Sequence, residues 1–186
     1  MIRSFAIVAA ACALAVPMSA AAADADPVFD AFQSICWDTA GDYLASVKAA
    51  DTGGWKDTDV VADTEAGLSV TDKAAREKQV GNKTYTVFIS RGLRHISTGD
   101  VKEQSCKLVV NKPDNALVGE GQSWVGVAPD AGDPTLAVYY VKLAPGKPDH
   151  LGKDGINAAM AAGGFGILKF QQDSDSGIVV YQGYSK

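Results

Sequence analysis

The chain has 186 residues, and 22 acidic side chains outnumber 17 basic ones, which gives a formal net charge of −5. A surface with this charge excludes nucleic acid as a general partner, and a hydrophobic content of 47% excludes a largely disordered chain. The length corresponds to one domain preceded by a short leader.

The first residues have the pattern of an export signal. Arg3 precedes an apolar run of about 12 residues, and the small residues at positions 19–23 follow. The run is shorter than the roughly 20 residues that a membrane-spanning helix needs. We therefore predict a signal peptide over residues 1–23, a single domain over residues 24–186, and a periplasmic or secreted location in a bacterium. We expect no membrane span after cleavage.

The first element after the leader is predicted to be helical. Asp26-Pro27 is typical of an N-cap followed by proline in the first helical position, and apolar residues then recur at helical spacing as far as Cys36. Residues 39–42 either interrupt the helix or form a second N-cap. We expect one long or broken helix over residues 27–51.

A polar segment separates this helix from the predicted strands. Residues 55–82 lack a clear period, so we expect a loop and then a short helix over residues 71–78. A further short helix is expected over residues 155–162. β-Branched and aromatic residues predict strands over residues 84–90, 105–111, 136–143, 166–171 and 178–184, and residues 123–127 form either a short strand or a loop entry.

These elements predict the fold class. Residues 173–177 are rich in aspartate, serine and glycine, which is typical of a hairpin turn between the last two strands. The short connections favour antiparallel pairing. We therefore expect an α+β fold with an N-terminal helix packed on a mostly antiparallel sheet of about five strands, and a C-terminal hairpin. PAS-like, profilin-like and cystatin-like sheets all fit this order.

Charge is distributed unevenly along the chain. Residues 24–72 contain eleven acidic residues and only two lysines, whereas residues 73–112 contain nine basic residues and only three acidic ones. The basic middle could bind anionic polymers of the cell envelope. The pattern favours the alternative, a solvated face that the acidic N-terminal part balances.

Two cysteines remain after the leader, which itself contains Cys12. Export would place Cys36 and Cys106 in an oxidising compartment, where two thiols of one small domain usually pair. Such a bridge would join the helix to a strand across a loop of about 70 residues, and loop-closure entropy gives about 4.4 kcal/mol for that span. The spacing does not resemble C-x-x-C, so we predict a structural disulfide and no redox role.

Candidate catalytic groups do not form a recognised motif. Residues 121–126 approach the G-x-S-x-G elbow around Ser123, but the second glycine comes one residue late. His95 and His150 lie beside loop-like residues and lack the spacing of a zinc site. We name no catalytic, cofactor-binding or metal-ligating residue, and we expect no cofactor.

The aspartates of the predicted hairpin turn resemble the start of a calcium-binding loop. The bidentate glutamate that closes such a loop is missing, because Tyr184 occupies the twelfth position. A hairpin turn therefore explains residues 173–177 better than a metal site.

One set of residues suggests a family. The pattern Phe32-x-x-Ile35-Cys36-x-x-Thr39-x-Gly41-Asp42, followed by Gly54-Trp55 and by the single later cysteine Cys106, resembles small exported proteins of unknown function from alphaproteobacteria. The resemblance covers residues 27–112. It implies export, one disulfide and no known activity, and it assigns no site residue.

The function expected from these observations is that of a non-enzymatic binding or accessory module of the cell envelope. Its partner would be an envelope component, a small ligand or a protein, and nucleic acid is not expected. Two alternatives remain open. One is an exported hydrolase that uses dispersed acids or Ser123, and the other is an inhibitor of a protease or lysozyme.

Overall fold

The computed structural model describes residues 27–59, 67–96, 99–113, 117–142 and 146–186. The predicted signal peptide and its cleavage site lie outside these residues. Among the described helices, none is long and apolar enough to cross a membrane.

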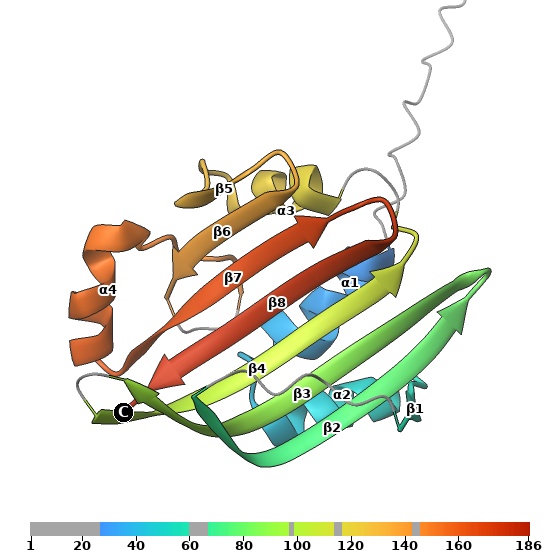
Figure 1. The fold of residues 1–186 in the computed structure, drawn as a ribbon, viewed down its shortest axis with the longest axis horizontal. Coiled ribbons are helices and arrows are strands. Elements are labelled where there is room, and N and C mark those ends of the chain that lie inside the picture. The colour runs from blue at the N-terminus through green and yellow to red at the C-terminus, as the bar shows by residue number, and fades with distance from the viewer. Residues whose placement is uncertain (1–26, 60–66, 97–98, 114–116, 143–145) are drawn as a thin grey trace, which may run out of the picture.

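Eight strands form one sheet, and every neighbouring pair is antiparallel (Figure 1). Their order across the sheet is β1-β2-β3-β4-β8-β7-β6-β5. The strands are Lys56–Asp57 (β1), Leu68–Val80 (β2), Lys83–Ile96 (β3), Gly99–Asn111 (β4), Ala131–Asp133 (β5), Leu136–Val141 (β6), Gly164–Gln172 (β7) and Ser176–Ser185 (β8).

The expected α+β fold with about five strands is wrong, because the protein is mostly sheet. The largest error concerns β2, where we predicted a loop and a short helix over residues 71–78. Twelve residues of β2 pair with β3, and this ladder outweighs the helix propensity of the side chains between Lys73 and Lys78. The C-terminal hairpin of β7 and β8 is present as predicted.

Short helices pack on one face of the sheet, behind the strands in Figure 1. Those on this face are α1 (Pro27–Phe32), the π-helical turn η1 (Gln33–Trp37), α2 (Tyr43–Thr52) and α3 (Leu117–Val125), whereas α4 (Gly152–Ala161) lies beside the ends of β6 and β7. Residues 123–127 were expected to form a short strand or a loop entry, but residues 123–125 are the last turn of α3.

The break between η1 and α2 follows from its sequence. Ala40 and Gly41 both have positive φ angles, 54° and 69°, which ends the first helical segment. A Cβ atom on Gly41 would lie 2.8 Å from the ring of Tyr181, so only glycine fits there. Asp42 then caps α2, because its Oδ1 accepts the N–H of Ala45 at 2.9 Å. The predicted second N-cap is confirmed.

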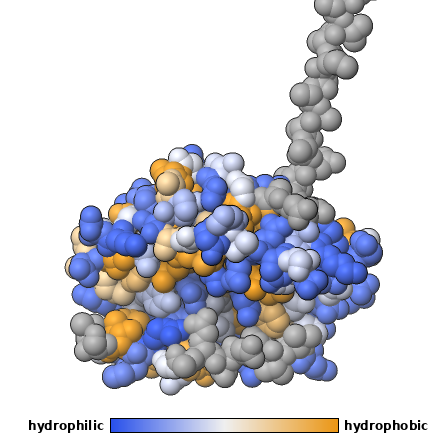
Figure 2. Space-filling model, turned by 45° about the horizontal axis from the view of Figure 1, so that its top comes forward, coloured by the Kyte–Doolittle hydropathy of each residue, from blue (hydrophilic) through white to orange (hydrophobic). Residues whose placement is uncertain are grey.

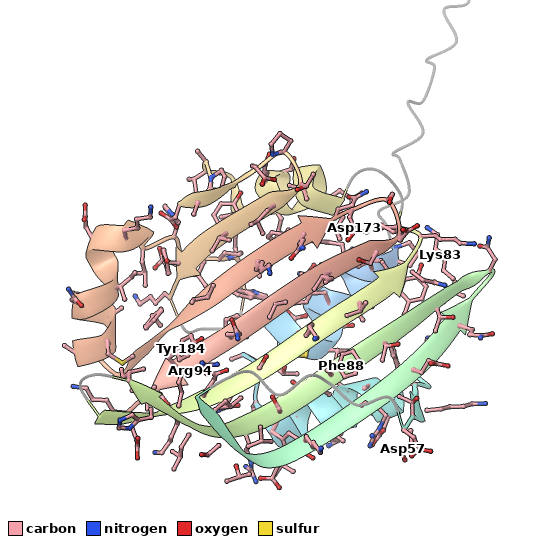
Figure 3. The ribbon with its side chains drawn as sticks, viewed as in Figure 1. Asp57, Lys83, Phe88, Arg94, Asp173 and Tyr184 are labelled. Carbon is pink, nitrogen blue, oxygen red and sulfur yellow. A yellow bond between two sulfur atoms is a disulfide. The ribbon has the colours of Figure 1, made fainter. Side chains whose placement is uncertain are left out.

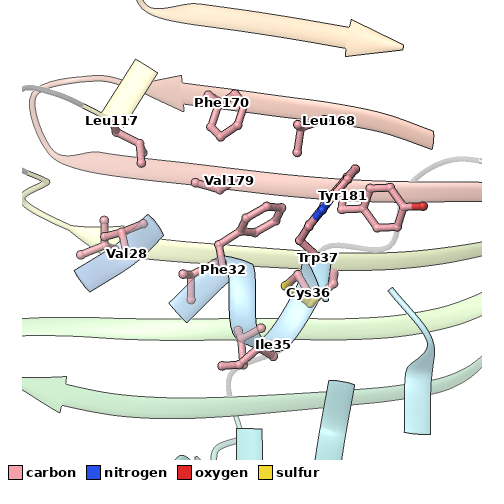
Figure 4. Close-up of a cluster of buried hydrophobic side chains, with 14 of the residues drawn as sticks. Val28, Phe32, Ile35, Cys36, Trp37, Leu117, Leu168, Phe170, Val179 and Tyr181 are labelled. Atoms are coloured by element: carbon pink, nitrogen blue, oxygen red, sulfur yellow. A yellow bond between two sulfur atoms is a disulfide. The ribbon is translucent and has the colours of Figure 1, made fainter. Parts of the chain in front are cut away.

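The core lies between these helices and the sheet (Figure 4). Phe32 and Trp37 enter it from the helices, and Phe170 and Tyr181 from the strands, all at most 1% exposed. Burial raises the pKa of the Tyr181 hydroxyl, which has no hydrogen-bond partner among the described residues. This aromatic layer fixes the position of the helices over β7 and β8.

The predicted disulfide is present. Cys36 of η1 and Cys106 of β4 are bonded at an S–S distance of 2.00 Å, and both are completely buried. The bond joins the first helical segment to the middle of the sheet, 70 residues further along the chain.

Two glycines of α3 allow a matched test of its packing. A Cβ atom on Gly121 would lie 2.5 Å from the ring of Phe170, whereas one on Gly119 would meet no atom within 4 Å. We expect Gly121→Ala to lower the free energy of unfolding by about 1–2 kcal/mol, because overpacking exceeds the gain in helix propensity. Gly119→Ala should raise it by up to about 1 kcal/mol. Urea unfolding followed by circular dichroism measures both, and equal effects at the two sites would contradict this packing.

Candidate functional site

The second face of the sheet carries no described helix, and we call it the uncovered face. In β4, Cys106 and Leu108 are buried against the helices. Successive side chains of a strand point to opposite faces, so Ser105 and Lys107 lie on the uncovered face. Both are half-buried there.

A hollow of about 670 Å³ lies on this face over β2, β3, β4 and β8. Small-molecule sites usually occupy roughly 300–1,000 Å³, so the hollow has a suitable size for a ligand. At the β2 edge it reaches Arg76 of β2, Asp57 of β1 and Tyr43 of α2, and Figure 3 shows Asp57 at that edge. In Figure 2 orange hydrophobic groups lie among blue hydrophilic groups on the visible surface.

Strand register places four polar side chains of the hollow in one line, which we call the polar row. Lys73 of β2 lies opposite Ser90 of β3, Ser90 opposite Ser105 of β4, and Ser105 opposite Gln182 of β8. Neighbours in the row are separated by one inter-strand spacing of about 4.8 Å. Within the described residues, neither serine hydroxyl has a hydrogen-bond partner. The row therefore offers an ammonium group and two free hydroxyl groups side by side.

A second line of side chains runs beside the polar row, about 7 Å further along the strands. We call it the mixed row: it contains Phe88, Lys107, Val180 and Lys169, in this order across β3, β4, β8 and β7. The ammonium group of Lys107 lies 4.9 Å from the centre of the Phe88 ring. Val180 lies between the two lysines and is 8% exposed. Apolar and cationic groups thus alternate in this row.

A buried ion pair lies at the end of the hollow near Tyr184. Glu103 is 1% exposed, and its carboxylate accepts two hydrogen bonds from Arg94, one from Nε and one from Nη2 at 3.2 Å. Tyr184 lies opposite Glu103 in the register, and Figure 3 shows Arg94 and Tyr184 together. The bidentate contact compensates the buried carboxylate, so Glu103 contributes little negative potential to the hollow.

The ion pair gives a testable consequence for stability. We expect Glu103→Ala to lower the free energy of unfolding by about 2–3 kcal/mol, because Arg94, whose side chain is only 19% exposed, loses its carboxylate. Glu103→Gln keeps an acceptor and should cost about half as much. Urea unfolding measures both variants, and Asp154→Ala at an exposed position of α4 is the control. A Glu103→Ala protein as stable as the control would rule out the pair as a structural contact.

A second set of ion pairs closes the β2 edge of the hollow. Arg76 contacts Asp51 of α2, with Nε at 2.7 Å from Oδ1, and it also pairs with Asp57 of β1. The hydrogen bond that Arg76 donates to Asp51 raises the pKa of Arg76, and the two carboxylate charges add to this effect. Arg76 is therefore already engaged by carboxylates.

The remaining charges make the hollow positive. Lys73, Lys107 and Lys169 line it, and none of them forms an ion pair with a carboxylate in the described ranges. With Asp57 and Glu103 paired to arginines, the only other lining carboxylate among the described residues is that of Asp59. A positive hollow on a chain with a net charge of −5 favours anionic ligands locally.

The structure does not bring the candidate catalytic residues together. Ser123 lies on α3 and donates its hydroxyl to the carbonyl oxygen of Gly119 at 2.9 Å. His95 Nδ1 lies 2.8 Å from Asp100 at the exposed end of β3. His150 pairs elsewhere, as described next. The elbow-like segment is part of a helix, so it lacks the strand-to-helix turn that the motif requires.

His150 and Asp130 form a half-buried pair near β6. The Nε2 atom of His150 lies 2.9 Å from Oδ2 of Asp130, which also accepts the backbone N–H of Tyr140 at 2.9 Å. The same strand pairs with His150 through Val141. These contacts fix the segment that leads into α4, which is a structural role.

In the turn between β7 and β8, the carboxylate of Asp173 accepts hydrogen bonds from other residues of the turn. Asp173 accepts the backbone N–H groups of Asp175 and Ser176, and then the Ser176 hydroxyl, and these hydrogen bonds lower the pKa of Asp173. The turn interpretation of residues 173–177 agrees with these contacts. Among the described residues, no group of three or more histidine, cysteine, aspartate or glutamate side chains is placed to hold a metal ion.

The chain matches no protein-family model, no curated protein and no solved structure. The resemblance to exported alphaproteobacterial proteins therefore stays a prediction. The uncovered face and its hollow carry the functional argument on their own residues.

Proposed function

We propose that this chain is an exported binding module that holds a small ligand in the hollow of the uncovered face. The observation that carries the proposal is a space of about 670 Å³ whose lining combines apolar and hydroxyl groups with lysines that form no ion pair among the described residues. Export is supported by the leader-like pattern of residues 1–23 and by a buried disulfide, which forms in oxidising compartments. The host compartment would be the periplasm or the medium.

Export predicts a defined mature mass. When the full chain is expressed in a bacterium, we expect the protein in the periplasmic extract or the medium, cleaved after Ala23 and without free thiols. Intact-mass measurement before and after reduction checks both features. An uncleaved, reduced protein confined to the cytoplasm would contradict export, and the same measurement on a chain with Arg3 and the apolar run deleted is the control.

The binding site is tested by filling the hollow. Ser105→Trp places a large side chain in the middle of the polar row, whereas Ser123→Trp adds the same side chain at an exposed position of α3. We expect ligand from a host extract to co-purify with the unmodified protein and with Ser123→Trp, as seen by native mass spectrometry, and to be absent from Ser105→Trp. Circular dichroism verifies that both variants fold. Equal loading of all three proteins would place the ligand elsewhere, and no loading of any would contradict a binding function.

A further inference from the structure

We propose that the hollow binds a long-chain carboxylate, with the carboxylate on the polar row and the hydrocarbon chain along the mixed row. This inference rests on the proposed binding function and names its ligand class. Three features of the hollow carry it: the position of its unpaired cations, the engagement of its arginines, and the apolar groups beside the polar row.

The polar row suits a carboxylate. Lys73 lies at one end, the free hydroxyl groups of Ser90 and Ser105 follow, and Lys107 lies two residues along β4 from Ser105. A carboxylate at the two serines would accept hydrogen bonds from both hydroxyls and lie between two ammonium groups. Such charge-assisted bonds are the stronger ones in proteins. The neighbouring Glu103 does not repel an anionic ligand strongly, because the positive charge of Arg94 compensates the Glu103 carboxylate.

The engaged arginines leave lysines as the cations that meet the anionic group of a ligand. Guanidinium groups bind carboxylate or phosphate through two parallel hydrogen bonds, whereas lysine provides a point charge. Arg76 is held by Asp51 and Asp57, and Arg94 by Glu103. The lining cations that lack a carboxylate partner among the described residues are lysines, which a carboxylate can satisfy singly.

The mixed row suits a hydrocarbon chain. Phe88 and Val180 lie on either side of the Lys107 position, and Ile178 lines the hollow two residues before Val180. The Phe88 ring holds the Lys107 ammonium at 4.9 Å, and the Lys107 stem adds apolar surface between Phe88 and Val180. Each methylene group buried here tightens binding by up to about fourfold.

The test uses cis-parinaric acid as a fluorescent fatty acid and its methyl ester as the uncharged control, with the full mature protein. We expect saturable binding of the acid, weaker binding of the ester, and competition by saturated carboxylates that strengthens with chain length. A higher salt concentration should weaken the binding of the acid and leave the binding of the ester unchanged. The double variant Lys73→Gln/Lys107→Gln should bind the acid about tenfold more weakly. Lys48→Gln/Lys153→Gln removes the same charge from exposed sites on α2 and α4 and should leave binding unchanged.

The outcomes separate the ligand class from the binding function. Equal affinity for acid and ester, or no effect of the Lys73/Lys107 double variant, would overturn the carboxylate inference while leaving an apolar binding site. Preferential binding to anionic phospholipid vesicles over the free acid would also overturn it. Absence of binding by either probe, together with no co-purified ligand, would overturn the proposed function as well.

Discussion

Removal of the disulfide is expected to lower the free energy of unfolding by about 3–4 kcal/mol, since the bond closes a loop of 70 residues in the unfolded chain. The variant Cys36→Ala/Cys106→Ala leaves no unpaired thiol, and its small side chains keep the site apolar. For a chain of this length the change corresponds to a fall in Tm of about 10 °C. Urea and thermal unfolding, both followed by circular dichroism, measure the effect.

The native protein supplies the control for this expectation. Reduction of the unmodified protein should lower its stability to nearly that of the double alanine variant, and the variant itself should not respond to the reductant. A variant as stable as the oxidised protein would show that helix packing alone holds η1 on β4. The disulfide would then contribute nothing beyond the aromatic contacts around it.

The sequence predicted the features in which local pattern and tertiary role agree. The strand expected over residues 105–111 forms part of β4, and its cysteine bonds to the first helical segment as predicted. Asp42 is an N-cap because it precedes a helix and its side chain is short enough to accept the Ala45 N–H. In each case a few neighbouring residues determine the structure.

The prediction from the sequence was wrong at β2, where the helix propensity of the residues disagrees with their tertiary pairing. Alanine, arginine, glutamate, lysine and glutamine follow Lys73, and these residue types favour a helix. Only the tertiary pairing favours a strand. A register shift between Val70 and Asp72 also breaks the period of two that identifies a strand. The long ladder with β3 decides the outcome, and it involves residues that local pattern cannot connect.

The prediction for the α3 segment was wrong for the opposite reason. Its glycines lower the intrinsic helix propensity, so residues 123–127 were interpreted as a strand or loop entry. The helix forms because Gly121 lets its backbone approach the Phe170 ring of β7 closely. A glycine that weakens the isolated helix thus allows the packing that stabilises it.

The hollow could not be predicted for a related reason. Its polar row draws one side chain each from β2, β3, β4 and β8, and the last strand inserts beside β4 only in the folded sheet. The excess of bases over residues 73–112 was the one signal that pointed toward it, and the pattern favoured a solvated face over a bound ligand. The register now shows that Lys73 and Lys107 of this segment share a hollow.

Replacement of Trp37 is expected to be as damaging as loss of the disulfide. Trp37 is 1% exposed, and its ring makes edge contacts with Trp124 and Tyr181 at centroid distances of 5.0 and 5.2 Å. Its indole N–H also donates to the carbonyl oxygen of Gly146. Trp37→Ala removes the ring from between α3 and the sheet, so we expect a loss of about 4 kcal/mol in the free energy of unfolding.

The conservative variant separates the ring from its hydrogen bond. Trp37→Phe keeps much of the aromatic contact but leaves the Gly146 carbonyl without the indole donor, so its loss should be about 1–2 kcal/mol. Guanidinium unfolding of both variants measures the difference. If Trp37→Phe were as unstable as Trp37→Ala, the hydrogen bond to Gly146 would dominate over packing. Because Trp37 directly follows Cys36, a disulfide that survives in Trp37→Ala would hold η1 on β4 and limit the damage to the contacts with α3 and β8.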